Sequence, residues 1–344
     1  MKNIHILLII FAVLSSCQNN KTLLNNEETV DNRNYCNSVY YWKTTFKLSD
    51  EERKFLDNFQ VQRLYLRYFD VSCDADFKDK TIPVPVATLK FLDSIPPNLD
   101  VIPTVFIDNE LFKNSNMKGI DTLLLKRISI MSATNDVFKN SDIKEIQIDC
   151  DWTKTTESAY FNFLQKIRNN LNSQIILSAT IRLHQLNMTA PPVDRGVLMC
   201  YNTGGIRNPQ TENSILSASD VALYSKHVKT YPLPLDVAYP AFSWAVWFHD
   251  GQFQALLRGL SCDNENLTLK KDNVYIVKNG FYQEGKYLAA GDEIRFEDSD
   301  TEEILKTKKL VENQLSNYSV ILYHLNSSNL SKYSNDEINQ IYSH

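Results

Sequence analysis

The sequence predicts an α/β fold, a (β/α)8 TIM barrel with a small antiparallel β insertion between strands 7 and 8. Short apolar or alternating runs recur along the chain, and most are followed by a segment with helical periodicity. This alternation is typical of a parallel sheet with crossover helices. Eight such runs are present, which is the number of strands that closes this barrel. One later stretch breaks the alternation with a two-residue period.

The eight expected strands are spaced along most of the chain. They cover residues 38–43, 63–68, 100–107, 145–149, 174–180, 196–201, 235–239 and 319–323.

Three of the intervening helices are clear from their periodicity. Ser49 and Glu52 have the spacing of a capping box, and an apolar face that includes Phe55 follows them. Segments 156–171 and 300–315 have the same periodicity before the next strand. We expect each helix to pack its apolar face against the outside of the barrel.

Residues 262–298 alternate between apolar and polar side chains. Their Asn279-Gly280 dipeptide is a strong hairpin signal. An insertion here would lie at the carboxyl-terminal rim of the barrel, where active sites of this fold form. A flap that contacts a ligand and a hairpin without a role in the site are both open alternatives.

The N-terminal residues predict an export signal. Lys2 precedes a short apolar core, and the segment ends in Leu14-Ser-Ser-Cys17, the form of a bacterial lipoprotein signal. We expect residues 1–17 to be this signal, with Cys17 lipidated as the mature terminus; an ordinary cleaved signal is the alternative. Residues 18–35 are polar and predict a flexible tether, and 36–344 the barrel domain. The expected location is the cell envelope, with the body held at a bacterial membrane by the lipid.

Composition argues against several partners and cofactors. The net charge is −5 and the basic residues are scattered, so nucleic acid is not an expected partner. The histidines stand far apart and no Cys-x-x-Cys occurs, so no metal site is expected and no cofactor is indicated. One disulfide among the remaining cysteines is conceivable in an oxidising envelope. An acidic loop lacks the glycine and the terminal glutamate of the common calcium loop; it contains Asp70, Asp74, Asp76 and Asp79.

The chemistry expected of the barrel centres on the segment EIQIDCDWTKTTE, residues 145–157. Side chains alternate along a strand, so Asp149 and Asp151 should project to one face about 6.6 Å apart. Two carboxyls that close cannot both ionise freely in a partly buried site, so one should have a raised pKa. This arrangement suits general acid and base catalysis on a glycoside. The alternative is a pair of solvated aspartates that ends the strand.

The segment IQIDCDWT resembles the fourth strand of the chitinase-like glycoside hydrolase family 18, whose motif is Asp-x-x-Asp-x-Asp-x-Glu. Asp149 and Asp151 match the second and third aspartates, and Trp152 matches a frequent aromatic residue. The first aspartate falls at Ile146 and the catalytic glutamate at Thr153. Threonine cannot donate a proton to a leaving group at neutral pH, so the substrate-assisted mechanism of the family does not carry over at that position.

A second segment, VDRGVLMCYNTGG, is similar to the sixth strand of the same family, where Met-x-Tyr-Asp contacts the acetamido group of the substrate. Met199 and Tyr201 fit this pattern, and Asn202 replaces the aspartate. The resemblance implies that Tyr201 and Asn202 orient the substrate. Together with the signal, the pattern also resembles bacterial lipoproteins with a glycosidase-like barrel.

Further rim candidates follow the other expected strands. Arg67 and Asp70 would form an ion pair or hold a hydroxyl group. Tryptophan and other aromatic rings offer flat faces to sugars, or form core beneath the insertion; the candidates are Trp152, Tyr239, Phe242, Trp244 and Trp247. Weaker candidates are the acids Asp108 and Glu110 and the histidines His184 and His324.

The expected function is that of a lipid-anchored, glycoside hydrolase-like protein acting on an extracytoplasmic polysaccharide or oligosaccharide. Asp149 and Asp151 are the expected catalytic residues. Because Thr153 replaces the acid, the acid role would pass to Asp151 or to Glu157. Otherwise the protein binds a glycan without cutting it, or is an envelope scaffold whose barrel mouth is plugged by the insertion.

Overall fold

A computed structural model describes residues 35–73, 82–134 and 143–344. The expected signal (1–17) and all but the last residue of the expected tether (18–35) lie outside the described residues, as do Asp74, Asp76 and Asp79. The cysteines that are described form no disulfide; they are Cys36, Cys73, Cys150, Cys200 and Cys262.

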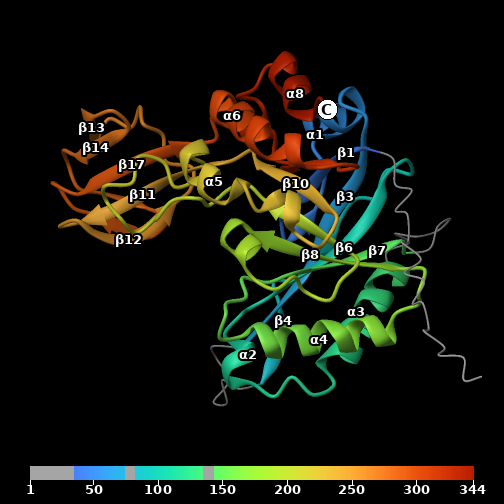
Figure 1. Cartoon of the computed structure of the whole chain (residues 1–344). Helices are drawn as coiled ribbons and strands as arrows, with labels where there is room; N and C mark the ends of the chain where they lie inside the picture. Colours follow the sequence, from blue (N-terminus) through green and yellow to red (C-terminus); the bar gives the residue numbers. More distant parts are fainter. Residues whose placement is uncertain (1–34, 74–81, 135–142) are drawn as a thin grey trace, which may run out of the picture. The chain divides into compact units, whose positions relative to one another are not determined.

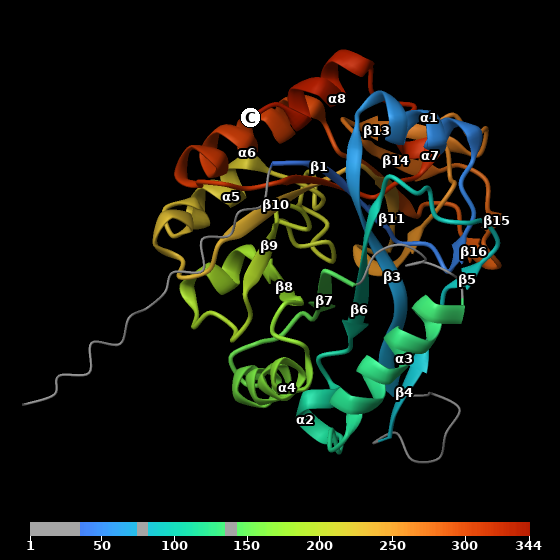
Figure 2. The ribbon, with the colours of Figure 1, turned by 90° about the vertical axis from the view of Figure 1, so that its right-hand side faces the viewer.

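Eight parallel strands form a closed barrel. They are β1 (Asn37–Tyr41), β3 (Val61–Cys73), β6 (Asp100–Ile107), β7 (Glu145–Asp149), β8 (Ile176–Arg182), β9 (Arg195–Met199), β10 (Leu235–Pro240) and β18 (Val320–Tyr323). Each pairs with the next along the chain, and β1 closes the ring by pairing with both β18 and β3. Figure 2 shows the strands following one another around this ring. The predicted barrel is confirmed, because each of its expected strands overlaps one of these.

The second barrel strand is much longer than its apolar run suggests. β3 continues past Tyr68 to Cys73 because a short strand, β4 (Pro83–Val86), pairs with its end in the antiparallel sense. A further parallel pair, β2 (Thr45–Phe46) and β5 (Lys90–Phe91), lies outside the barrel sheet.

Helices cover the barrel at most of its crossovers. They are α1 (Asp50–Asn58), α2 (Leu111–Asn114), α3 (Ile120–Thr134), α4 (Glu157–Asn170), α5 (Ala218–Ser225), α6 (Thr301–Val311), α7 (Ser327–Leu330) and α8 (Asn335–Tyr342), with 3-10 turns η1 (Leu183–Asn187), η2 (Val228–Thr230) and η3 (Glu312–Gln314). The three expected helices are confirmed as α1, α4 and α6, and the Ser49–Glu52 capping box is present. The crossover from β8 to β9 has only η1 in place of an α-helix. Within the described part of the chain, no helix is both long and apolar enough to cross a membrane.

The insertion is larger than expected, because it begins at Ser243 and not at residue 262. It is a five-stranded antiparallel sheet in the order β12-β11-β17-β14-β13, with a small hairpin of β15 and β16. The strands are β11 (Ser243–His249), β12 (Gln252–Leu257), β13 (Leu267–Lys271), β14 (Val274–Val277), β15 (Phe281–Gln283), β16 (Lys286–Leu288) and β17 (Glu293–Asp298). In Figure 1 its strands are grouped apart from those of the barrel. The sheet has its own apolar cluster, which includes Ala245, Leu257 and Ile294.

The prediction of a hairpin turn at Asn279-Gly280 is wrong. The strands on either side of it, β14 and β15, do not pair with each other. Gly280 does not have a positive φ, and a Cβ there would collide with the ring of Tyr287. Two residues in succession have the positive φ that a type I′ turn requires at Asp250-Gly251, between β11 and β12, and at Glu284-Gly285, between β15 and β16.

A buried ion pair ties the insertion to the loop after β9. Arg295 Nε donates to Glu297 Oε1 at 2.6 Å, and both side chains are almost fully buried. The other Arg295 nitrogens donate to the main-chain oxygens of Ile206 and Asn208. Glu297 also accepts a hydrogen bond from Ser214. The sheet is thus fastened to the segment that directly follows Tyr201 and Asn202.

We expect the substitution Glu297→Ala to lower the free energy of unfolding by about 3–5 kcal/mol, because it leaves the Arg295 guanidinium buried without its partner. Urea unfolding followed by circular dichroism measures this change. The matched control is Glu293→Ala in the same strand, whose pair with Lys270 is exposed and should contribute less than about 1 kcal/mol. Equal effects of the two substitutions would contradict a structural role for the buried pair.

Candidate functional site

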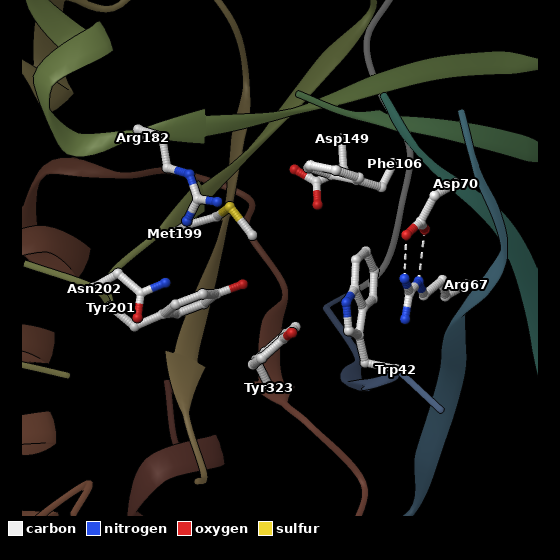
Figure 3. Close-up of a pocket in the computed structure, with 10 residues that line it drawn as sticks. All are labelled: Trp42, Arg67, Asp70, Phe106, Asp149, Arg182, Met199, Tyr201, Asn202 and Tyr323. Carbon is white, nitrogen blue, oxygen red and sulfur yellow. Dashed lines mark hydrogen bonds and ion pairs between the residues drawn. The ribbon is translucent and has the colours of Figure 1, made fainter. Parts of the chain in front are cut away.

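A pocket of about 190 Å³ lies at the carboxyl ends of the barrel strands. Side chains from seven of the eight barrel strands, or from the residues directly after them, line it (Figure 3): Trp42, Arg67, Asp70, Phe106, Asp149, Arg182, Met199, Tyr201, Asn202 and Tyr323. Active sites of (β/α)8 barrels form at this end. The insertion contributes none of these residues, and a cavity beside Asp149 is not what a barrel plugged by the insertion would show.

Asp149 is the buried acid of this pocket. It is the last residue of β7, and its Oδ1 accepts a hydrogen bond from Thr180 Oγ1 at 2.6 Å. Burial raises the pKa of Asp149 to about 6; the nearby charge of Arg182 opposes this shift and that of Asp151 adds to it. The expectation that one carboxyl of the pair has a raised pKa is therefore met by Asp149. Its main cause is loss of solvation, with the neighbouring carboxylate a smaller one.

Asp151 does not share the pocket, contrary to the prediction from strand alternation. β7 ends at Asp149, so the two-residue period does not continue to Asp151. The Asp151 side chain is 54% exposed and forms an ion pair with Arg182, with 2.5 Å between Oδ1 and Nε. Asp149 is the single member of the pair that lines the cavity.

The positions that would supply another acid lie outside the pocket. Thr153 is exposed, and its hydroxyl contacts that of Thr155 in the turn before α4. Glu157, at the start of α4, is paired with Lys154 at 2.9 Å. The expectation that Glu157 reaches into the site is therefore wrong.

Arg67 and Asp70 form a bidentate ion pair inside the pocket. Arg67 Nε donates to Asp70 Oδ1 at 2.7 Å, and Nη2 donates to the second oxygen (Figure 3). The guanidinium carbon lies 5.3 Å from the ring centre of Trp42. The expected rim pair is therefore present, and it presents Arg67 to the cavity in a fixed orientation.

Tyr201 and Asn202 line the pocket, where the motif placed them. Tyr201 is buried and its ring stacks on that of Tyr323, with centroids 4.9 Å apart and planes 24° apart. Asn202 has a φ of 55° and donates its main-chain N–H to the oxygen of Ile215. This left-handed residue turns the chain away from the barrel directly after the pocket.

Trp152 and Tyr239 were expected to contact a ligand, and this is wrong for both. Both are fully buried. Trp152 packs against Tyr160 and Phe161 of α4, and Tyr239 donates its hydroxyl to Glu312 at 2.8 Å. Their rings point into the layer between barrel and helices, so neither ring has a free face.

The two tryptophans of β11 lie outside this cavity and are partly exposed, so their contact with a ligand stays a prediction. Trp244 donates its indole N–H to Glu297, and Trp247 donates to Asp292 within the insertion. Trp244 packs against Phe242, which in turn contacts Tyr201. Trp244 therefore contacts the pocket indirectly, through Phe242 and Tyr201.

Four lining residues were missed by sequence reasoning: Trp42, Phe106, Arg182 and Tyr323. Each lies within two residues of the end of an expected strand, but this position alone does not distinguish it from other residues at strand ends.

The weaker candidates lie elsewhere. Asp108 accepts hydrogen bonds from Ser72 and from the N–H of Glu110, whose side chain pairs with Lys113. Burial lowers the pKa of His184 and lowers that of His324 to about 4, and neither residue lines the cavity. Among the described residues, no cluster of histidine, cysteine and acidic side chains has the arrangement of a metal site.

The raised pKa of Asp149 predicts a pH-dependent stability. In the folded state its pKa is about 6, above the value of 3.8 for an unperturbed aspartate. Its contribution to stability is therefore complete below about pH 4 and is lost as the pH rises through 6. We expect Asp149→Asn to be more stable than the wild type at pH 8, by on the order of 2–3 kcal/mol, and nearly equal at pH 4. Urea unfolding at both pH values tests this; Asp57→Asn, at an exposed site, should show no such dependence.

Comparisons with known proteins identify solved structures with a similar fold. No family model matches the sequence, and no curated protein sequence does either. The spore cortex-lytic enzyme SleL of Bacillus cereus is similar in structure, with a TM-score of 0.52 and 13% identity over 90% of this chain and 74% of SleL. A chitinase from Chromobacterium violaceum ATCC 12472 has a TM-score of 0.50 and 10% identity over 90% of this chain and 98% of that enzyme. At these identities the similarity establishes the (β/α)8 barrel fold.

Proposed function

We propose that this protein is a glycoside hydrolase-like protein that takes a sugar residue of an oligosaccharide or polysaccharide into the pocket at the barrel mouth. The observation that carries the proposal is the buried carboxyl of Asp149, whose pKa is raised to about 6 inside a cavity with aromatic walls. Such a carboxyl is suited to exchange a proton near neutral pH. The structural similarity to a chitinase agrees with a glycan ligand.

The pocket has the parts that sugar recognition uses. Trp42 and Tyr323 give the cavity aromatic walls, which suit the C–H groups of a sugar. Arg67 is held in place by Asp70 and can donate to hydroxyl groups. Asp149 has one oxygen bonded to Thr180, which leaves Oδ2 for the ligand. In a hydrolase, protonated Asp149 would donate its proton to the leaving glycosidic oxygen as the bond from that oxygen to the anomeric carbon breaks. A water molecule would then give its hydroxyl to the anomeric carbon and its proton back to Asp149.

A second candidate is a glycan-binding protein without hydrolytic activity. Two observations favour it: Asp151 is paired with Arg182 outside the pocket, and an exposed threonine occupies the position of the family's acid. Glycoside hydrolysis commonly uses two carboxyl groups. The other carboxyl in this pocket, Asp70, has both oxygens bonded to Arg67.

The substitution Asp149→Asn separates the two candidates. The probes are chitin oligosaccharides, with reducing-end release and calorimetric binding as the measurements. A hydrolase should lose at least about a hundredfold in turnover, the scale of general acid catalysis, and keep its ligand. A binder releases no product in either form. Glu157→Gln is the matched control, since Glu157 lies outside the pocket, and should behave as the wild type. Wild-type protein that neither cuts nor binds any of a panel of glycans would refute both candidates.

We also propose that the protein is lipid-anchored in the cell envelope and acts on an extracytoplasmic glycan. The support is the N-terminal sequence, in which a short apolar core ends in Leu-Ser-Ser-Cys17.

The anchor predicts a change in partitioning when Cys17 is replaced by serine. The wild-type chain expressed in a bacterium should incorporate labelled palmitate and enter the detergent phase, and Cys17→Ser should do neither. Cys36→Ser, in the folded body, is the control and should be labelled as the wild type. Labelling of both variants would contradict acylation at Cys17.

A further inference from the structure

We propose that the pocket selects a sugar that carries a carboxylate, such as a uronic acid, and that Arg182 and Tyr201 bind this group. The inference rests on the proposed function and names the class of sugar that the same site takes.

Arg182 has an unused donor inside the pocket. Its Nε is bonded to Asp151, while its Nη1 is buried and has no hydrogen-bond partner among the described residues. A guanidinium has donors and no acceptor, so any group that satisfies Nη1 must be an acceptor. Leaving a buried charged donor unpaired is costly, which makes this atom a site for a ligand oxygen.

Tyr201 supplies a second unused polar group. Only 3% of Tyr201 is exposed, and its hydroxyl has no hydrogen-bond partner within the described chain. In Figure 3 this hydroxyl, the Arg182 guanidinium and the Asp149 carboxyl are directed toward the same space. All three side chains line one cavity. One ligand group can therefore meet both donors.

Two polar groups of the pocket, Arg182 Nη1 and the Tyr201 hydroxyl, have no hydrogen-bond partner among the described residues. Both Asp70 oxygens are bonded to Arg67, and Asp149 Oδ1 is bonded to Thr180, so Asp149 Oδ2 is the carboxylate oxygen left to accept from a ligand. A sugar hydroxyl has one oxygen that can accept, whereas a carboxylate has two oxygens and both only accept. A carboxylate also gives two oxygens to an arginine, with charge assistance. Two unpaired donors on one cavity, one of them charged, therefore favour an acidic sugar over a neutral one.

The charges around Asp149 make this binding depend on pH. The charged groups that face Asp149 are the cation Arg182 and the anions Asp151 and Asp70. The other titratable groups near it are neutral, because burial raises their pKa values; they are Tyr40, Tyr160, Tyr201, Tyr323 and the thiol of Cys150. When Asp149 is protonated, it can donate a hydrogen bond to a carboxylate ligand and does not repel it. When it ionises, it repels a carboxylate ligand, so the affinity for an acidic sugar should fall between pH 5 and pH 7.

The test compares matched sugars on the full chain by titration calorimetry. The probes are glucuronic acid against glucose and galacturonic acid against galactose, at pH 5 and pH 7. We expect at least one acid to bind about tenfold or more tightly than its neutral partner, with the preference larger at pH 5. Tyr201→Phe keeps the ring and should lose about tenfold in affinity for the acid, with little change for the neutral sugar. The matched control is Tyr231→Phe, which removes another buried, unbonded hydroxyl away from the pocket and should change neither.

A second variant covers the case in which Tyr201→Phe does not fold. Asp151→Asn removes the exposed partner of Arg182 and should strengthen binding of the acid. Neutral sugars, N-acetylglucosamine included, that bind as tightly as the acids would overturn the selectivity while leaving the proposed function in place. The same holds if Tyr201→Phe or Asp151→Asn leaves acid binding unchanged. A protein that binds no sugar at all would defeat the proposed function and this inference with it.

Discussion

The burial of one carboxyl group at the mouth of the barrel is the constraint on which the rest of the site depends. Asp149 ends β7, and the neighbouring strands of the closed ring leave only 3% of it exposed. Thr180 and Arg182, both on the next strand, partly compensate the lost solvation. Burial of an unpaired carboxylate is costly, and it raises the pKa of Asp149, whereas Thr180 and Arg182 lower it. The resulting pKa of about 6 lets Asp149 change its protonation state near neutral pH. The surrounding side chains then determine which ligand groups this acid can meet.

The fold could be predicted well from the sequence because a parallel barrel repeats one simple pattern. Each buried strand is a short apolar run, and each of the three clear helices shows its period and in one case its capping box. The predicted strand boundaries were wrong where a strand pairs with an element that its own sequence does not indicate. β3 is long because β4 pairs with its end, and the insertion starts early because β11, which is rich in aromatics, belongs to a second sheet.

The site was predicted in part for the same reason. Asp149, Tyr201, Asn202, Arg67 and Asp70 line the pocket, since they follow recognisable strands. Asp151 was misplaced because the strand ends two residues earlier, which breaks the alternation on which its prediction relied. Trp152 was misplaced because its role was taken from the resemblance to a family motif, and its ring packs against α4 instead. Trp42, Phe106, Arg182 and Tyr323 were missed because a single residue at a strand end carries no pattern of its own. Their convergence depends on closure of the ring, which sequence periodicity does not describe.

The attachment of the insertion has a consequence for how this protein can be divided. Arg295 satisfies two main-chain oxygens of the loop after β9, and Glu297 accepts a hydrogen bond from Ser214 of the same loop. Excising residues 243–298 would strip these groups of their partners only a few residues from Asn202. The barrel therefore depends on the insertion and is not a separable module. Substitutions in the added sheet can shift the loop after β9, and so change the specificity of the cavity while every residue that lines it stays the same.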